Sequence, residues 1–251
     1  EAPGQLVVDA MDAAGIDGAI LVSPFWRYRY DDRYAAAVVA RWPGRFALVS
    51  PMDAGRPDIA DFVAAWREQP GTAGLRLLHT EVDIAAIASA RYAPAFRALQ
   101  ALNVPLCVFA PGHLARIGEL ARRYPELSLV VDHLGLDVWP TFPPPPSRFD
   151  RIADVVSLAS YPNISIKITG APALSASAYP YPDIWPVIEQ ILAAFGPGRA
   201  MWGSDWTRTA PGVSLADSVR VFVDPARLSA GDRAQLLGGT ARRIFGWAPA
   251  P

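Results

Sequence analysis

The sequence predicts an α/β fold, specifically a TIM-type (β/α)8 barrel whose first strand is missing from the given chain. Seven near-continuous apolar stretches are each followed by a segment with apolar residues on one helical face, a pattern typical of a parallel sheet covered by helices. No GxGxxG follows the first stretch, so a closed barrel is favoured over an open dinucleotide-binding sheet. The length of 251 residues suits one such barrel, and we expect residues 1–251 to form a single domain.

The elements follow one another regularly. The chain opens on a helix, because Leu6, Val7 and Ala10 repeat at helical spacing before Gly15. Apolar runs predict strands at 18–24, 46–51, 73–78, 105–110, 127–133, 164–170 and 200–205, each leading into a helix, and a closing pair of helices spans 228–245.

Seven strands are one fewer than a barrel needs, and the missing strand belongs at the front. Without it, backbone groups beside the first and last strands would be left unpaired. We therefore expect a strand before Glu1 that truncation, cleavage or disorder removes from the given chain, or that a neighbouring subunit supplies.

Composition narrows the partners and the compartment. A net charge of −1 provides no basic surface that would attract nucleic acid, so a small-molecule substrate is the expected partner. Assembly of the chain into a homo-oligomer is a further possibility. No stretch is apolar enough to cross a membrane, and the N-terminus lacks the basic residues of a signal peptide. With Cys107 as its single cysteine, the chain fits a reducing compartment, and we expect a cytoplasmic protein.

Asp205 and His133 are the candidate catalytic residues. Both stand at the carboxyl ends of predicted strands, where barrels of this type carry their chemistry. The alternatives are that Asp205 caps the next turn and that His133 is a hydrogen-bonded structural residue. Asp132 should face the opposite side of the strand from His133, as a salt-bridge or supporting group.

Cations within predicted buried strands are the candidate substrate-binding groups. Arg76 and Lys167 would be costly to bury alone, so each either pairs with an internal acid or holds a substrate anion. His79 and His113 stand where they could line the mouth, or serve as surface and capping residues. Apolar walls for a substrate are expected from aromatic residues of the loops, namely Trp26, Tyr28, Trp139 and Trp206.

Five motifs together resemble the amidohydrolase superfamily, in its branch of sugar-acid lactonases and 2-pyrone-4,6-dicarboxylate lactonase. They are DDRYAAAVVARWPGRFALVSP (31–51), GLR (74–76), VVDHLG (130–135), KITG (167–170) and WGSDW (202–206). The resemblance implies a distorted TIM barrel in which Asp205 takes a proton from the attacking water, His133 polarises the carbonyl or binds metal, and Arg76 holds a substrate carboxylate.

The sequence departs from the family pattern at two places, and the first of them bears on the cofactor. The family begins with a strand bearing His-x-His, and this chain has no such pair; Thr240 stands where an asparagine is usual. The resemblance implies a divalent metal, Zn or Mn, with His133 and Asp205 as ligands if one is bound, while a metal-independent mechanism stays open. Without the His-x-His strand a metal would keep at most two of its usual side chains.

Three functions follow from these observations. The first is a hydrolase that opens the lactone ring of a small anionic sugar acid or dicarboxylate, with Asp205 activating water. The second is a decarboxylase that uses the same barrel and acid on an aromatic or muconate-type acid. The third is a catalytically inactive barrel that binds a ligand or partner.

Overall fold

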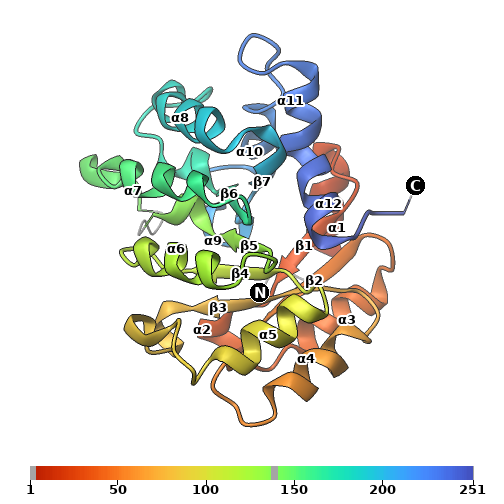
Figure 1. The fold of residues 1–251 in the computed structure, drawn as a ribbon. Coiled ribbons are helices and arrows are strands. Elements are labelled where there is room, and N and C mark those ends of the chain that lie inside the picture. The colour runs from red at the N-terminus through yellow and green to blue at the C-terminus, as the bar shows by residue number, and fades with distance from the viewer. Residues whose placement is uncertain (1–3, 137–140, 251) are drawn as a thin grey trace. The chain divides into compact units, whose positions relative to one another are not determined.

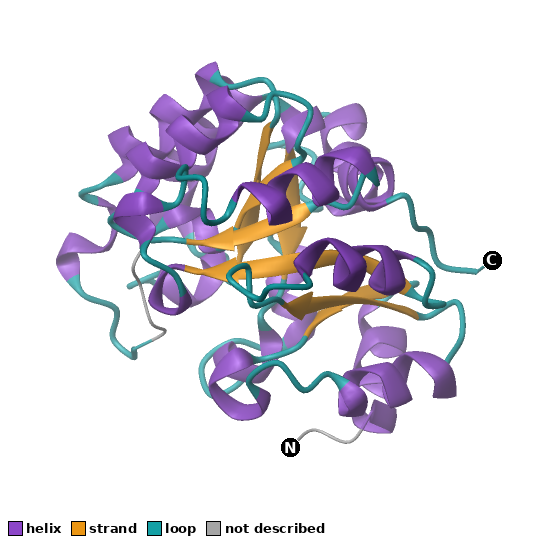
Figure 2. Ribbon diagram, turned by 60° about the horizontal axis from the view of Figure 1, so that its bottom comes forward, coloured by secondary structure: helices purple, strands orange, loops and turns teal. Residues whose placement is uncertain are grey.

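Helices and strands alternate along the chain in the computed structural model, which describes residues 4–136 and 141–250 (Figures 1 and 2). The seven strands are parallel and follow one another in the order of the chain. The chain divides into two compact units. The first unit comprises residues 1–16, 132–160 and 165–241, and the second comprises 17–131, 161–164 and 242–251. The expectation of a single domain stays a prediction.

The second unit contains five of the strands. Parallel pairing joins β1 (Ala19–Val22), β2 (Phe46–Pro51), β3 (Thr72–Leu78), β4 (Leu106–Phe109) and β5 (Leu129–Val131) in that order. The helices of this unit are α2 (Phe25–Tyr28), α3 (Arg33–Arg41), α4 (Ile59–Arg67), α5 (Ala93–Ala101) and α6 (Leu114–Arg123). Figure 1 shows α3, α4 and α5 gathered beside β2 and β3.

Burial explains why these strands are apolar without interruption. Every residue of β2 is buried, as expected for a parallel strand covered on both faces. The helices bury one stripe only. In α5, for example, Ala95, Phe96 and Leu99 are fully enclosed, at the spacing of a single helical face.

The first unit contains the remaining two strands. In this unit β6 (Ile164–Thr169) pairs with β7 (Ala200–Gly203), with Lys167 opposite Met201 and Thr169 opposite Gly203. The helices that belong to it are α1 (Gly4–Ala14), α7 (Ile152–Ser157), α8 (Trp185–Phe195), α9 (Trp206–Thr209), α10 (Leu215–Arg220) and α11 (Ala230–Ala234). The final helix, α12 (Thr240–Phe245), begins in the first unit and ends in the second.

All seven predicted strands are present, and two local assignments need correction. The strand predicted over 127–133 ends at Val131, because the backbone turns into the left-handed region at His133 and Leu134, with φ of 51° and 56°. Trp26 and Tyr28, which were expected in a loop, lie in the one-turn helix α2. The strand expected before Glu1 stays a prediction.

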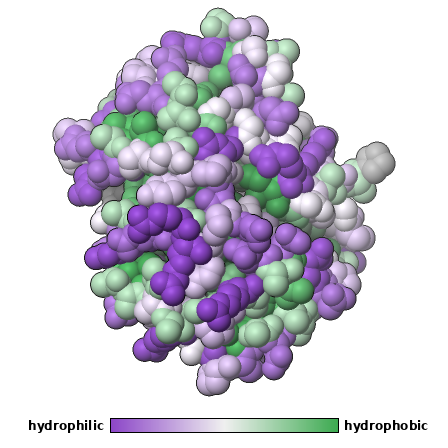
Figure 3. Space-filling view, viewed as in Figure 1, coloured by the Kyte–Doolittle hydropathy of each residue, from purple (hydrophilic) through white to green (hydrophobic). Residues whose placement is uncertain are grey.

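On the face that Figure 3 shows, hydrophilic residues are interspersed with smaller apolar areas. No helix within residues 4–136 and 141–250 is long and apolar enough to cross a membrane.

Candidate functional site

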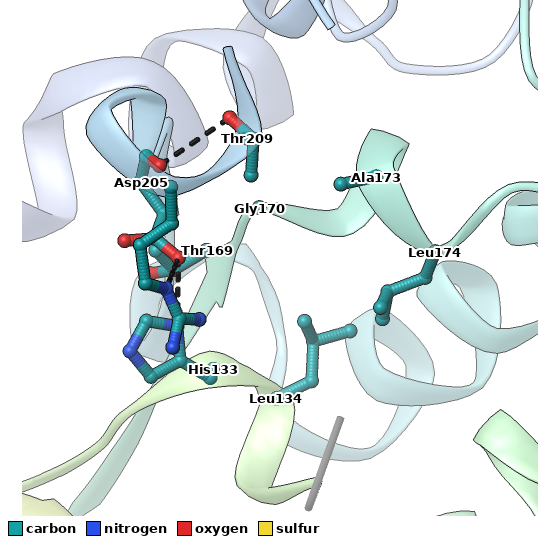
Figure 4. A pocket seen from close by; sticks show the side chains of 9 residues that line it. His133, Leu134, Thr169, Gly170, Ala173, Leu174, Asp205 and Thr209 are labelled. Atoms are coloured by element: carbon teal, nitrogen blue, oxygen red, sulfur yellow. Dashed lines mark hydrogen bonds and ion pairs between the residues drawn. The ribbon is translucent and has the colours of Figure 1, made fainter. Parts of the chain in front are cut away.

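A small pocket in the first unit contains both candidate catalytic residues. Its cavity volume is about 10 Å³, close to the space that one water molecule needs. Figure 4 shows a polar side formed by Asp205, Thr169 and His133, and an opposite side formed by Leu134, Ala173 and Leu174. The lining residues are His133, Leu134, Thr169, Gly170, Ala173, Leu174, Asp205, Arg208 and Thr209.

The backbone around the pocket is held in an unusual conformation. Asp205 stands between β7 and α9, in the position before the first helical residue, with φ of 50°. His133 and Leu134, in the 3₁₀ turn after β5, also have positive φ. Residues other than glycine seldom adopt this region, and they do so chiefly at functional sites where the surroundings compensate for the strain. Three such residues therefore line one pocket.

An acid, an imidazole and a guanidinium meet on the polar side. Asp205 Oδ2 accepts a hydrogen bond from Arg208 Nε at 2.6 Å and lies 3.8 Å from His133 Nδ1. All three side chains are largely buried, with 15%, 22% and 16% of the Asp205, Arg208 and His133 side chains exposed. Partial burial strengthens electrostatic interactions. A charge that develops in this pocket would therefore interact strongly with all three side chains.

The turn of α9 fixes the Asp205 backbone. Thr209 Oγ1 donates to the carbonyl oxygens of Ser204 and Asp205, both at 3.3 Å. Gly170 has φ of +70°, and a Cβ there would lie 3.7 Å from Asp205 Oδ2. That distance is an ordinary contact, but the positive φ would strain any other residue at this position, which explains the glycine that ends the KITG motif.

Lys167 is engaged in an ion pair outside this pocket. Its Nζ donates to Asp132 Oδ1 at 2.8 Å, with 11% of the lysine and 3% of the aspartate side chain exposed. Of the two alternatives that the sequence left open for Lys167, the structure shows the internal pair. Its role toward a substrate stays a prediction.

Arg76, His79 and His113 lie in the second unit. The Arg76 guanidinium stands over the Phe109 ring, 5.7 Å from its centroid. His79 Nδ1 is 3.2 Å from the Phe109 carbonyl oxygen, which can only accept, so this nitrogen carries the proton. His113 precedes α6 in the capping position, and its ring centroid is 5.5 Å from that of His79.

The predicted aromatic walls are distributed over both units. Trp26 is 66% exposed in α2, and Tyr28 stacks on Tyr34 with 5.9 Å between ring centroids. Trp206 begins α9 but does not line the pocket, and Trp139 lies outside the described residues. Substrate contacts by these residues stay predictions.

The described residues do not complete a metal site of the usual kind. Catalytic zinc is held by three protein ligands, and within residues 4–136 and 141–250 no group of three or more His, Cys, Asp or Glu residues is placed to hold a metal ion. The pocket supplies His133 and Asp205 alone, and the Arg208 guanidinium bonds to the same carboxylate. The described residues of this pocket therefore do not fit a catalytic zinc ion.

The sequence did not single out three polar residues of the pocket, Arg208, Thr209 and Thr169. Arg208 follows Asp205 by three residues, so a helix prediction immediately after Asp205 would have placed the two side chains together. Thr169 ends β6 beside Gly170, within the KITG motif (167–170), in which only Lys167 was considered as a site residue. Its position at a strand end was the available signal.

Comparison with known proteins identifies relatives over most of the chain. The sequence profile of the amidohydrolase family matches residues 7–247. An L-fucono-1,5-lactonase from Burkholderia ambifaria is 31% identical over 183 residues, which are 70% of this chain and 60% of that protein. A second L-fucono-1,5-lactonase, from Burkholderia multivorans, is 30% identical over 79% of this chain and 71% of its own length. The matched part thus spans less than two thirds of the first relative.

Solved structures share the fold. An amidohydrolase from Burkholderia multivorans, crystallised with HEPES, superposes with a TM-score of 0.82 at 26% identity, covering 97% of this chain and 88% of that one. A structure of an amidohydrolase from the same organism, with bound zinc, gives the same TM-score at 24% identity and the same coverage. The α/β fold is therefore that of amidohydrolase barrels.

Proposed function

The chain belongs to the amidohydrolase family, a family of hydrolases, and from that premise we propose that it opens the lactone ring of a small sugar acid by adding water. Asp205 is the proposed base and His133 the proposed partner of the carbonyl oxygen. The observation that carries the proposal is the 3.8 Å approach of Asp205 Oδ2 to His133 Nδ1 in a pocket with room for about one water molecule. The sugar-lactone substrates named for the two Burkholderia relatives give the substrate class.

The proposed reaction needs one proton acceptor and one stabiliser of negative charge. Asp205 takes a proton from water, and the water oxygen forms a bond to the lactone carbonyl carbon. His133 stabilises the negative charge that grows on the carbonyl oxygen, while Arg208 holds the Asp205 carboxylate by its hydrogen bond to Oδ2. The ring carbon–oxygen bond then breaks, the proton passes from Asp205 to the leaving oxygen, and the product is the open hydroxy acid.

Arg76 is proposed separately as a residue that binds a substrate carboxylate. Arg76 presents a planar guanidinium, which suits two parallel hydrogen bonds to a carboxylate. Trp26, Tyr28 and Trp206 are proposed as further contacts, as is His113.

The test is the activity of an Asp205→Asn variant on L-fucono-1,5-lactone and related sugar lactones. An amide cannot take the proton, so we expect kcat to fall by about 10²–10⁴-fold, the usual contribution of a general base. Asp154→Asn is the matched control, because Asp154 in the same unit forms an equivalent Arg Nε to Asp Oδ2 pair with Arg151 on the surface. It should keep wild-type activity.

Three other outcomes would contradict the proposed role of Asp205 or favour the decarboxylase or the inactive barrel. Wild-type lactonase activity that survives in Asp205→Asn would remove Asp205 from the mechanism. Release of carbon dioxide from an aromatic or muconate-type acid, without ring opening of any lactone, would favour the decarboxylase. Binding of a lactone without turnover by the wild-type protein would favour the inactive barrel.

A further inference from the structure

We propose that the hydroxyl group of Thr169 binds the water molecule that Asp205 deprotonates. This inference rests on the proposed function, and it assigns a role to a residue that the motif analysis did not single out.

The first observation is a buried hydroxyl without a partner. Thr169 Oγ1 is inaccessible to solvent, and no group in the described part of the chain forms a hydrogen bond with it. Buried polar atoms nearly always have a hydrogen-bond partner, and leaving one without a partner costs free energy. A valine would fill the same space on β6 without that cost. Among the described residues, the hydroxyl is therefore available to bind a water molecule.

The second observation is where this hydroxyl lies. Thr169 and Asp205 line the same pocket, on the same polar side (Figure 4). The cavity volume of about 10 Å³ is close to that of a single water site, and such a site needs at least two polar partners. The Thr169 hydroxyl and the Asp205 carboxylate provide them.

The third observation is the glycine opposite Thr169. Gly203 on β7 pairs with Thr169 in the strand register, and a Cβ at this position would lie only 2.7 Å from Thr169 Oγ1 and 3.3 Å from its Cγ2. Any larger residue would force the hydroxyl to move. The neighbouring strand thus keeps free the space around this oxygen.

The chemistry of the two groups suits a water that is about to attack. Water has two O–H bonds: the Asp205 carboxylate accepts one and Thr169 Oγ1 accepts the other. This orientation leaves a lone pair of the water oxygen directed toward a carbonyl carbon. Only Asp205 receives a proton during the attack, and Thr169 exchanges none. Thr169 therefore orients the nucleophile, and its loss should reduce turnover and leave substrate affinity unchanged.

The experiment compares Thr169→Val and Thr169→Ser with the wild-type protein, using kcat and KM on the lactone that the wild type turns over and the midpoint of thermal unfolding. Valine keeps the branched shape and removes the hydroxyl, so we expect kcat to fall by about 10- to 100-fold, as for misplaced reacting groups. KM should stay within about twofold, as for a group that acts on the chemical step. The unfolding midpoint of Thr169→Val should stay close to that of the wild type, because no group of the protein loses a hydrogen-bond partner. Serine should restore most of kcat.

Three results would overturn the inference. Wild-type kcat in Thr169→Val would show that the hydroxyl does not hold the nucleophile. A lowered unfolding midpoint in Thr169→Val, with an equal loss of kcat in Thr169→Ser, would show a structural role. If the wild type hydrolyses no lactone, the proposed function fails together with the inference. If Asp205→Asn is inactive while Thr169→Val is fully active, only the water site fails.

Discussion

At the scale of single residues, two aspartates of the first unit lie in opposite surroundings. Asp132 is 3% exposed and pairs with Lys167, whereas Asp154 is 46% exposed and pairs with Arg151. Breaking a buried pair leaves one charge without a partner and without water. Breaking an exposed pair leaves the remaining charge in contact with water, which costs little. The two pairs should therefore differ strongly in their contribution to stability.

Lys167→Met tests this difference. We expect a loss of about 3–5 kcal/mol in the free energy of unfolding, because Asp132 stays buried with its charge. The double variant Lys167→Met/Asp132→Asn should recover part of the loss. Arg151→Ala should change stability by less than about 1 kcal/mol. Urea unfolding followed by far-ultraviolet circular dichroism measures all three, and equal effects of Lys167→Met and Arg151→Ala would contradict the burial argument.

Arg208 is expected to act through the Asp205 carboxylate that it contacts. Arg208→Met removes the hydrogen bond to Asp205 Oδ2 and should lower kcat by at least about tenfold, the scale on which a displaced reacting group loses rate. In the Asp205→Asn background the same substitution should have little further effect, because residues that act as a unit are not additive. Additive losses in a double-mutant cycle would show that the two side chains act independently.

The sequence allows Asp205 and His133 to be predicted as neighbours, because both follow apolar runs that must be strands. Arg208 and Thr169 could not be found in the same way. The relevance of Arg208 depends on the one-turn helix α9, which is too short to have a periodic pattern. The relevance of Thr169 depends on an unsatisfied hydroxyl, which only the packed structure reveals.

At the scale of elements, the strands are predictable because burial on both faces leaves a continuous apolar run. Their ends are less so. The run LSLVVDH continues to His133 in the sequence, but the strand stops at Val131 because positive φ angles at His133 and Leu134 redirect the chain into the pocket. The helix α2 was missed because four residues of mixed polarity show no helical period.

Asp183 anchors the long connection between β6 and α8. Its carboxylate accepts hydrogen bonds from Ser175 Oγ and the Ala176 backbone N–H, and it pairs with Arg148 at 2.7 Å. Burial of the carboxyl group opposes ionisation, yet these hydrogen bonds and the Arg148 charge outweigh it and lower the pKa of Asp183. The ionised carboxylate is thus favoured in the folded state.

The consequence is a stability that depends on pH. A lowered pKa contributes stability that is fully present above the ordinary carboxyl pKa of about 4 and is lost as the pH falls through the lowered value. Asp183→Asn should therefore destabilise the protein at pH 7, and the difference from the wild type should shrink under acidic conditions. Urea unfolding of both proteins at several pH values measures this, and a difference that does not vary with pH would contradict it.

At the scale of the whole molecule, neither compact unit is a continuous piece of chain. Each is assembled from three separate segments, so no single cut separates them. On this ground we propose that the chain folds as one domain. Urea unfolding followed by tryptophan fluorescence and by circular dichroism should give coincident transitions. Two separated transitions would show that the units unfold independently.

Metal binding also depends on the whole molecule, because its ligands would come from separate strands. The described residues supply His133 and Asp205 but no third ligand in their group, and the expected strand with His-x-His stays a prediction. If such a strand completes the barrel in the working protein, metal analysis of that protein should find a bound divalent ion, and a chelator should remove it together with activity.

The most direct test of the central claim, that Asp205 activates a water molecule and does not itself attack the lactone, is a single turnover in ¹⁸O-labelled water with enzyme in excess over L-fucono-1,5-lactone. Attack by water predicts that the carboxylate of the first product carries one labelled oxygen. Attack by the Asp205 carboxylate would form an anhydride, and hydrolysis of that anhydride at the aspartyl carbon would leave an unlabelled aspartate oxygen in the product of that turnover. Labelled product supports the account, and unlabelled product would contradict it.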